Sequence, residues 1–286
     1  MSTSAHPAYE VPRPVTGFAS VVLCRNPGTM ELEGTNTWLL RAPGVDRCVV
    51  VDPGPADAPD HTAAVVAASL ADGGRVEAIL VTHRHRDHTG GIDALAARTG
   101  APVRAWSGEL CRDAAPLRDR EVVAAAGLRI TVVRTPGHTA DSVSLLVEQA
   151  QPVPQHAERG PTGPGRALLT GDTILGRGTT VLDPTDGNLR EYLDSLDLLI
   201  REGVGCAMLP GHGPEHADAV TVAQDYRRHR ERRLVEIRRA LDELGLPPAA
   251  ADPVAVVAKV YADVDRALWP AARMSVEAQL NYLAGR

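Results

Sequence analysis

Three of the ten histidines stand close together, in the segment THRHRDH at residues 82–88. The segment follows the apolar run VEAILV, which predicts a buried strand, and α/β folds place their sites where such strands end. In an extended segment, residues two apart point to the same side, so His83 and His85 can bind one ion. Asp87 and His88 then offer a carboxylate and an imidazole to a second ion beside the first.

Three more residues of ligand type stand at glycine turns far along the chain. They are His138 in the segment TPGH, Asp172 in TGD and His212 in LPGHG. Glycine and proline shape tight turns that aim a side chain inward. Imidazole and carboxylate ligands together suit zinc, with manganese or iron as alternatives. An isolated His-x-His pair would be weak evidence, but the whole set predicts a metal site.

The elements that position these residues alternate between strands and helices over the first two hundred residues. Short β-branched runs between glycine and proline turns predict strands, for example at residues 19–24 and 47–52. Helical patterns occupy residues 56–71 and 188–203. This alternation favours an α/β layered core. Beyond residue 215 only helical patterns remain.

Charge and composition divide the chain into three predicted parts. We expect a flexible lead-in at residues 1–15, an α/β domain at 16–215 and a helical domain at 216–286. From residue 221 the chain carries 11 basic and 9 acidic residues, whereas the preceding part carries 19 and 27. The proline- and glycine-rich segment at residues 151–165 predicts a mobile loop between two paired strands.

Other features of the sequence predict a cytoplasmic protein with no membrane span. No run of 18 consecutive apolar residues occurs, and the first 15 residues lack the apolar core of a signal peptide. The cysteines form no C-x-x-C pair, which favours reduced, buried thiols over a disulfide framework. A net charge of −6 argues against a general polyanion binder, although a local basic patch remains compatible with it.

Four segments together resemble the metallo-β-lactamase fold superfamily: THRHRDHTGG, TPGHTADS, LTGDTILG and LPGHGP. The resemblance covers about residues 16–215 and implies a four-layer αβ/βα sandwich with the site at one edge between the sheets. It implies that Asp52, at the end of VVVDPGP, supports the site from behind the ligands. It also implies a first metal held by His83, His85 and His138, and a second held by Asp87, His88 and His212, with Asp172 bridging both.

A finer resemblance involves GTNTWLL (34–40), GDTILGRGTTVLD (171–183) and LPGHGPEHADA (209–219). These segments are similar to the β-lactamase-like protein 2 branch, which joins a hydrolase domain to a small winged-helix-like C-terminal domain. The branch implies an endoribonuclease-like phosphodiesterase acting on single-stranded RNA. The chain departs from it at residues 282–286, where it ends about where the wing hairpin should begin. In the implied reaction a metal-bridging hydroxide attacks, Asp172 holds both metals and Asp87 accepts the proton.

Two other functions stay open at this point. The same dinuclear site could hydrolyse a small thioester, lactone or amide, as in glyoxalase II or a weak β-lactamase. The chain could instead be a non-catalytic nucleic-acid-binding module with a structural metal, although seven ligand candidates exceed the four that a closed structural site needs. Asp172 stands where the best-known zinc β-lactamases carry cysteine, which disfavours penicillin hydrolysis. The sequence leaves the oligomeric state open.

Weaker signals concern residues around the expected site. Contacts with substrate are expected from the hydroxyl and amide side chains of Asn36, Thr37, Thr179 and Thr180. Arg84 and Arg86 alternate with the ligands and should point away from the metals. The remaining histidines stand in none of the ligand motifs and are expected at the surface: His6, His61, His156, His216 and His229.

The helical tail carries an apolar stripe and many arginines. Its apolar residues repeat at helical spacing at Leu234, Ile237, Leu241 and Leu244. The other faces of this helix hold arginines that either remain solvated or contact an RNA backbone: Arg227, Arg228, Arg230, Arg232, Arg233, Arg238 and Arg239.

Overall fold

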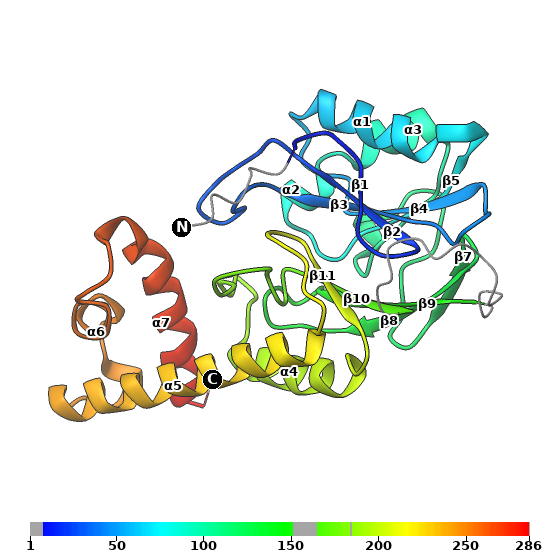
Figure 1. Cartoon of the computed structure of the whole chain (residues 1–286). Coiled ribbons are helices and arrows are strands. Elements are labelled where there is room, and N and C mark those ends of the chain that lie inside the picture. Colours follow the sequence, from blue (N-terminus) through cyan, green and yellow to red (C-terminus); the bar gives the residue numbers. More distant parts are fainter. Residues whose placement is uncertain (1–7, 151–164, 184, 286) are drawn as a thin grey trace, which may run out of the picture.

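Two β-sheets face one another at the centre of the computed structural model, which describes residues 8–150, 165–183 and 185–285 (Figure 1). Within these residues the first sheet has the strand order β1-β2-β3-β4-β5-β6 and the second has the order β11-β10-β9-β8-β7. The strands of the first sheet are β1 (Arg13–Pro14), β2 (Ala19–Leu23), β3 (Asn36–Leu40), β4 (Arg47–Val51), β5 (Arg75–Leu80) and β6 (Val103–Arg104). Those of the second are β7 (Val122–Ala125), β8 (Leu128–Arg134), β9 (Val143–Gln149), β10 (Arg166–Gly171) and β11 (Ala207–Pro210).

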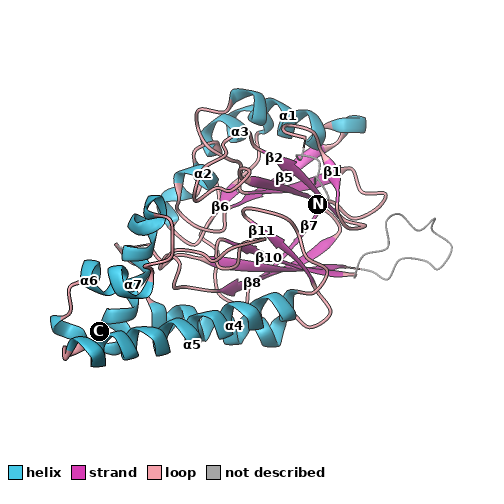
Figure 2. Cartoon of the chain, turned by 60° about the vertical axis from the view of Figure 1, so that its left-hand side comes forward, coloured by secondary structure: helices cyan, strands magenta, loops and turns pink. Residues whose placement is uncertain are grey.

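Helices cover the outer face of each sheet, which gives four layers (Figures 1 and 2). Helices α1 and α3 lie over the first sheet, and α4 and α5 lie under the second. This arrangement confirms the αβ/βα sandwich expected from the sequence. The helices are α1 (Pro59–Ser69), α2 (Arg86–Thr89), α3 (Ile92–Thr99), α4 (Leu189–Glu202), α5 (Ala219–Leu244), α6 (Pro253–Val260) and α7 (Trp269–Leu283).

The main hydrophobic core fills the space between the two sheets. It joins Trp38 and Leu80 of the first sheet to Ile130 and Leu145 of the second. Because each sheet packs against helices on its other face, its strands are apolar on both sides, and all five residues of β3 are buried. Complete burial of one such apolar side chain contributes about 1.5–3 kcal/mol, so this core dominates the stability of the sandwich.

Helix α4, under the second sheet, begins and ends where its sequence predicts. The side chain of Asn188 accepts hydrogen bonds from the backbone of Arg190 and Glu191 and so caps the first turn of α4. Tyr192, Leu196 and other apolar residues of α4 are buried against the sheet. The fixed start of α4 also fixes the preceding loop, because Asn188 N bonds to Gly137 O beside His138.

The C-terminal region is helical, as predicted, and residues 219–285 contain no strand in the described part of the chain. The first half of α5 packs on the sandwich through Ala223 and Tyr226. The second half packs on α6 and α7 through Ile237 and Leu241. Leu244, expected at the end of the apolar stripe, is instead 37% exposed because the helix ends there at Gly245. The winged-helix kinship and the boundary at residues 215–216 stay predictions.

Two sequence predictions fall partly outside the described residues. Residues 1–7 of the expected lead-in lie outside them, whereas Arg13–Pro14 pair with β2 in the first sheet. Residues 151–164 of the expected loop also lie outside them. The strands on either side, β9 and β10, pair antiparallel as predicted, with Glu148 opposite Arg166. None of the described helices has the length and apolar character that a membrane span requires.

Replacement of Leu145 by alanine should lower the free energy of unfolding by about 2–5 kcal/mol, because Leu145 is fully buried between the sheets. Urea denaturation followed by circular dichroism measures this change. Val204→Ala is the control, because Val204 is 61% exposed and its truncation should change the free energy by less than about 0.5 kcal/mol. Equal losses in both variants would contradict the placement of this core.

Candidate metal centre

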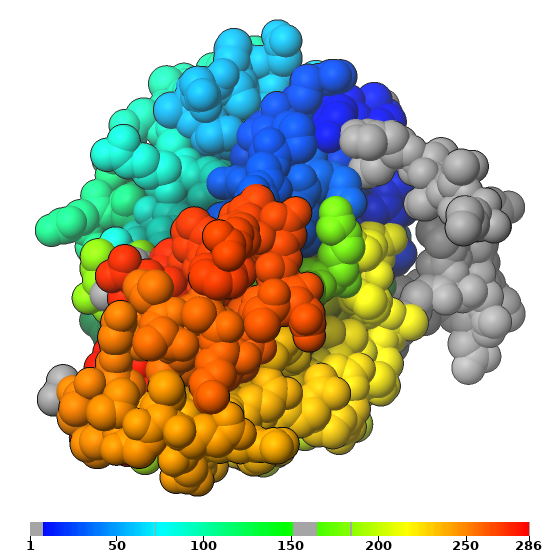
Figure 3. Space-filling view, turned by 90° about the vertical axis from the view of Figure 1, so that its left-hand side faces the viewer, coloured from blue at the N-terminus to red at the C-terminus, as the bar shows by residue number. Residues whose placement is uncertain are grey.

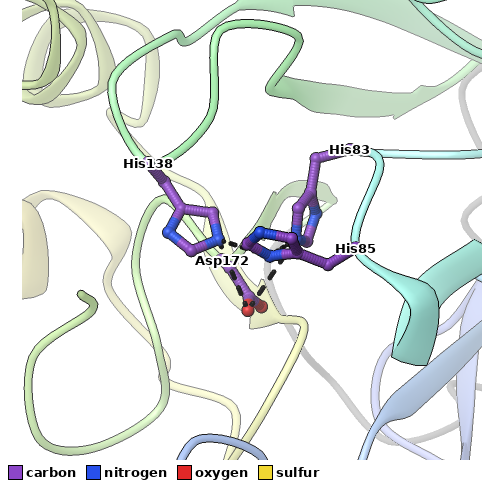
Figure 4. A group of neighbouring side chains, drawn as sticks. All are labelled: His83, His85, His138 and Asp172. Atoms are coloured by element: carbon purple, nitrogen blue, oxygen red, sulfur yellow. Dashed lines mark hydrogen bonds and ion pairs between the residues drawn. The ribbon is translucent and has the colours of Figure 1, made fainter. Parts of the chain in front are cut away.

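Loops that leave both sheets at one edge bring the seven expected ligands together. The loop after β5 carries His83 and His85, and helix α2, which follows it, carries Asp87 and His88. The loops after β8, β10 and β11 carry His138, Asp172 and His212. The seven residues form two groups, and within each group the ligand atoms lie within 4.8 Å of one another. The first group is His83, His85, His138 and Asp172, and the second is Asp87, His88 and His212. Figure 4 shows the side chains of the first group pointing toward one another.

Outer hydrogen bonds fix the ring orientation of two imidazoles in the first group. His85 Nε2 donates to Asp183 Oδ2 at 2.9 Å, and His138 Nδ1 donates to the backbone oxygen of Val181 at 2.6 Å. Since a neutral imidazole carries one hydrogen, these bonds leave His85 Nδ1 and His138 Nε2 without one. The bare nitrogens face the centre of the group.

Asp52 fixes the third imidazole of the first group, and one of the second, from behind. It accepts hydrogen bonds from Thr82 N and Thr82 Oγ1, each at 2.8 Å, and from His88 Nδ1 at 2.9 Å. Because the Thr82 hydroxyl hydrogen goes to Asp52, this hydroxyl accepts the Nδ1 hydrogen of His83 at 3.0 Å. Asp52 is 1% exposed and holds a left-handed φ of 56° at the end of β4. These bonds place Asp52 behind the ligand candidates, and the supporting role that the resemblance implies for it stays a prediction.

The inner nitrogens of the first group lie so close together that lone pairs facing one another require a proton or a metal cation between them. His85 Nδ1 lies 3.0 Å from His83 Nε2 and 3.1 Å from His138 Nε2. Burial, followed by the proximity of His88, lowers the pKa of His83 well below its usual value, and burial lowers the pKa of His138 to about 4. Both rings are therefore neutral at pH 7 and present lone pairs. Two ligands of a tetrahedral zinc ion lie about 3.3–3.4 Å apart, so a cation fits this spacing.

The second group carries an excess of negative charge. His88 Nε2 and His212 Nε2 lie 3.2 Å apart, and Asp87 Oδ2 lies 3.0 Å from His212 Nε2. Burial lowers the pKa of His212, but Asp172 and then Asp87 outweigh burial and raise this pKa to about 10. The carboxylates likewise raise the pKa of His88 against the effect of burial. A proton or a metal cation must therefore neutralise this group, and a metal would displace the protons.

Asp172 lies between the two groups. Its carboxylate oxygens lie 3.3 Å from His212 Nε2, 3.4 Å from His88 Nε2 and 3.9 Å from His138 Nε2. Although the residue is only 9% exposed, Oδ1 has no hydrogen-bond partner, which is costly for a buried carboxylate oxygen. A Cβ atom on Gly211 would lie 2.4 Å from this oxygen, so only glycine at position 211 permits the approach. The donor set fits one cation on each side of Asp172.

A cavity of about 730 Å³ opens beside the two groups and extends to the C-terminal helices. Ligand-type residues line one end, among them His85, Asp87 and His212. Apolar side chains from three separate segments line most of the remainder: Met30, Leu32, Leu175, Val181, Leu182, Val264, Leu268 and Met274. The sequence did not indicate this cavity, because its walls come from segments more than two hundred residues apart.

The four residues expected to contact substrate fall into two classes. Asn36 Nδ2 donates to the backbone of Pro210 and Gly213, and Thr37 Oγ1 donates to Asp52 O. These bonds hold the loop of His212 and the turn of Asp52, and neither side chain lines the cavity. Thr179 and Thr180 do line it, and Thr180 Oγ1 lies 3.2 Å from His138 Nδ1.

Sequence reasoning missed Asp183, which positions His85. Arg84 points away from the ligands, as expected, and its guanidinium bonds to Asp183 at 2.7 Å and to Asp186 at 2.8 Å. Arg86 lines the cavity instead of pointing away from it. Asp183 stands in the segment TTVLD, directly after the predicted site loop, and this proximity was the available signal.

The other histidines differ from the surface placement that the sequence predicts. His61 is fully buried and lies 2.8 Å from Thr37 Oγ1, so the prediction was wrong for it. Burial lowers the pKa of His61 to about 4. His216 and His229 are partly buried, and His229 lines the cavity. His6 and His156 lie outside the described residues.

A family model and named relatives place the chain among the same group of proteins. Residues 30–151 match the family described as the Metallo-beta-lactamase superfamily. The chain is 31% identical over 269 residues to a Caenorhabditis elegans protein named Beta-lactamase-like protein 2 homolog, and the match covers 92% of this chain and 82% of that protein. It is also 31% identical over 225 residues to a protein of Aspergillus chevalieri named atrochrysone carboxyl ACP thioesterase, with coverages of 78% and 65%.

A solved structure shares the whole fold, including the C-terminal helices. It is described as a beta-lactamase domain protein from Burkholderia ambifaria, and it superposes with a TM-score of 0.75 at 21% sequence identity. The similarity covers 99% of this chain and 91% of that one.

Replacement of Asp183 by asparagine should weaken metal binding about 10–100-fold, because His85 then loses the carboxylate that fixes its ring and raises its basicity. Competition with a chromogenic zinc chelator measures the affinity. Asp186→Asn is the matched control, because Asp186 bonds to Arg84 and to the backbone of Ala140 but to none of the seven ligands. The same affinity in both variants and in the unmodified chain would refute the positioning role of Asp183.

Proposed function

The chain belongs to the metallo-β-lactamase superfamily and is a hydrolase, and we propose that it uses two divalent cations to hydrolyse a small acyl thioester or ester. The observation that carries this proposal is the apolar cavity directly beside the two ligand groups. An acyl chain gains about 0.8 kcal/mol for each CH₂ group that it buries in such a cavity. The apolar walls would give no such gain to a polynucleotide backbone, because that backbone is charged at every residue.

We assign one cation to His83, His85 and His138, and the other to Asp87, His88 and His212, with Asp172 shared between them. Zinc suits these nitrogen-rich sites best, with manganese or iron as alternatives. Bound there, two divalent cations polarise the scissile carbonyl and supply a nucleophilic water at neutral pH. The neutral rings of His83 and His138 are ready for binding, whereas His88 and His212 must first release protons.

The protein side chains orient the reaction and move its proton. Asp52, Thr82 and Asp183 hold the imidazole rings through their outer nitrogens. Burial raises the pKa of Asp87, but His88 and His212 outweigh burial and hold this pKa well below its usual value. Asp87 is therefore ionised at neutral pH and lines the cavity, where its carboxylate can accept the proton of the attacking water.

The name of one relative supports the same reaction class. The Aspergillus chevalieri protein is named as an acyl carrier protein thioesterase, although the match spans 65% of its length. A thioester carbonyl is an electrophile of the kind that this site would activate. The proposed partner is therefore a small thioester or ester substrate.

Cleavage of single-stranded RNA is the second candidate, favoured by the arginines of α5. Four of these arginines already pair with carboxylates: Arg227, Arg228, Arg233 and Arg239. Among the described residues, Arg232 and Arg238 have no ion pair and remain for phosphate contacts. Since paired arginines contribute little to counterion release, this patch supports RNA binding less than its arginine number suggests. A non-catalytic module is no longer proposed, because the chain is a hydrolase.

Zinc- or manganese-loaded protein should hydrolyse members of a thioester and ester panel and leave labelled single-stranded RNA intact. Chelation should abolish turnover, and His83→Ala or Asp172→Ala should lower kcat/KM by more than about 100-fold, because each variant removes a direct ligand. Mass spectrometry of bound metal and circular dichroism distinguish metal loss from unfolding.

The contrary outcomes are equally specific. RNA cleavage that His85→Ala abolishes, together with an inert thioester panel, would reverse the order of the two candidates. Turnover close to that of the unmodified chain in a metal-free, folded Asp172→Ala variant would refute metal-dependent hydrolysis at this site.

A further inference from the structure

Arg230 of α5 is a buried cation without an anionic partner. The side chain is 3% exposed, and no described carboxylate lies within ion-pair distance of it. Its partners are neutral: Nη2 donates to Thr180 O, and the guanidinium lies over the ring of Tyr192 at 5.0 Å. Arginine is almost never fully buried unless it is paired, because the loss of hydration is costly. Arg230 also lines the cavity that leads to the metal ligands.

Gln279 of α7 lines the same cavity and is also unpartnered. It is 1% exposed, and neither its amide nitrogen nor its amide oxygen has a hydrogen-bond partner in the described part of the chain. A buried amide group that lacks a hydrogen-bond partner is costly. Its neighbours along α7, Val276 and Leu280, belong to the local apolar core. A ligand in the adjoining cavity is the available source of a partner.

The charge around this end of the cavity is positive. The Arg233 guanidinium lies over the ring of Tyr261 at 4.7 Å and is paired with Glu236, so it is already neutralised. Burial, followed by the charges of Arg230 and Arg233, lowers the pKa of His229 to about 4. Arg230 therefore supplies one uncompensated positive charge. Figure 3 shows the C-terminal helices, orange to red, lying across this face of the molecule.

We propose that Arg230 and Gln279 form a specificity subsite for a carboxylate group at the end of the substrate remote from the scissile bond. One unpaired guanidinium matches one negative charge, and its planar fork matches the two oxygens of a carboxylate. The Gln279 amide nitrogen, which has no partner and belongs to the same cavity wall, adds a second donor. The apolar walls hold the chain between this carboxylate and the metal centre.

This inference rests on the proposed function for the nature of the scissile bond, because an ω-carboxyl acyl thioester would place its carbonyl at the metals. The preferred substrate class is then the monothioester of a dicarboxylic acid. Arg230 and Gln279 act in recognition, so their loss should raise KM or Kd and leave metal content unchanged.

Calorimetric titration of the zinc-loaded protein with linear dicarboxylates of four to ten carbons, and with monocarboxylates of equal length, tests the subsite. A dicarboxylate and a monocarboxylate of equal length can both contact the metals with one carboxylate. The difference between their affinities therefore measures the contribution of the second carboxylate of the dicarboxylate. We expect the best dicarboxylate to bind about 10–100-fold more tightly than its monocarboxylate, in keeping with hydrogen bonds to a charged group. This advantage should fall below about threefold in Gln279→Leu and in Arg230→Met.

Gln224→Leu is the matched control, because Gln224 lies on the exposed side of α5 and should retain the full advantage. Arg230→Met also removes the hydrogen bond to Thr180 O and can disturb that loop. Gln279→Leu leaves this bond in place, so it tests the subsite independently. Absence of a dicarboxylate advantage at every length, or its persistence in both variants, would overturn the subsite. Hydrolysis is measured separately: tight dicarboxylate binding with no thioester turnover would refute the proposed reaction and leave the subsite intact.

Discussion

The convergence of bare imidazole nitrogens on one small space is the constraint on which the rest of the site depends. His85 Nδ1 lies 3.0 Å from His83 Nε2 and 3.1 Å from His138 Nε2, and the rings of His83 and His138 are neutral at pH 7. Lone pairs at this separation repel unless a cation lies between them. The outer hydrogen bonds to Thr82, Asp183 and the backbone of Val181 make the arrangement rigid, because they decide which nitrogen of each ring is bare.

The two sheets supply this rigidity by ending at a common edge. The ligand loops follow strands whose inward side chains pack in the core, such as Leu80 of β5 and Ile130 of β8. A shift of one ligand would therefore require a shift of the strand behind it. Asp52 connects the two ligand groups, because its carboxylate binds both Thr82 and His88. Gly211 shows how closely the loops pack, since any side chain there would collide with Asp172.

The C-terminal helices form part of the wall of the cavity beside the ligand groups. Helix α5 packs on the sandwich through Tyr226 and reaches beyond it to support α7. Together these helices complete a largely apolar cavity that the unpaired guanidinium of Arg230 also lines. The sequence presented the arginines of α5 as one basic patch. In the folded chain most of them form ion pairs, and the buried one faces the cavity.

Much of the site was determined by the sequence itself. The segment THRHRDH and the turns of His138, Asp172 and His212 are local patterns, and strand–turn geometry directs such side chains to one sheet edge whatever lies elsewhere. The layered fold followed from alternating strands and helices for the same reason. Only the tertiary structure decided the burial of His61, the support of His85 by Asp183 and the pairing state of each arginine. Each of these depends on which distant segment packs opposite, and local periodicity carries no information about that partner.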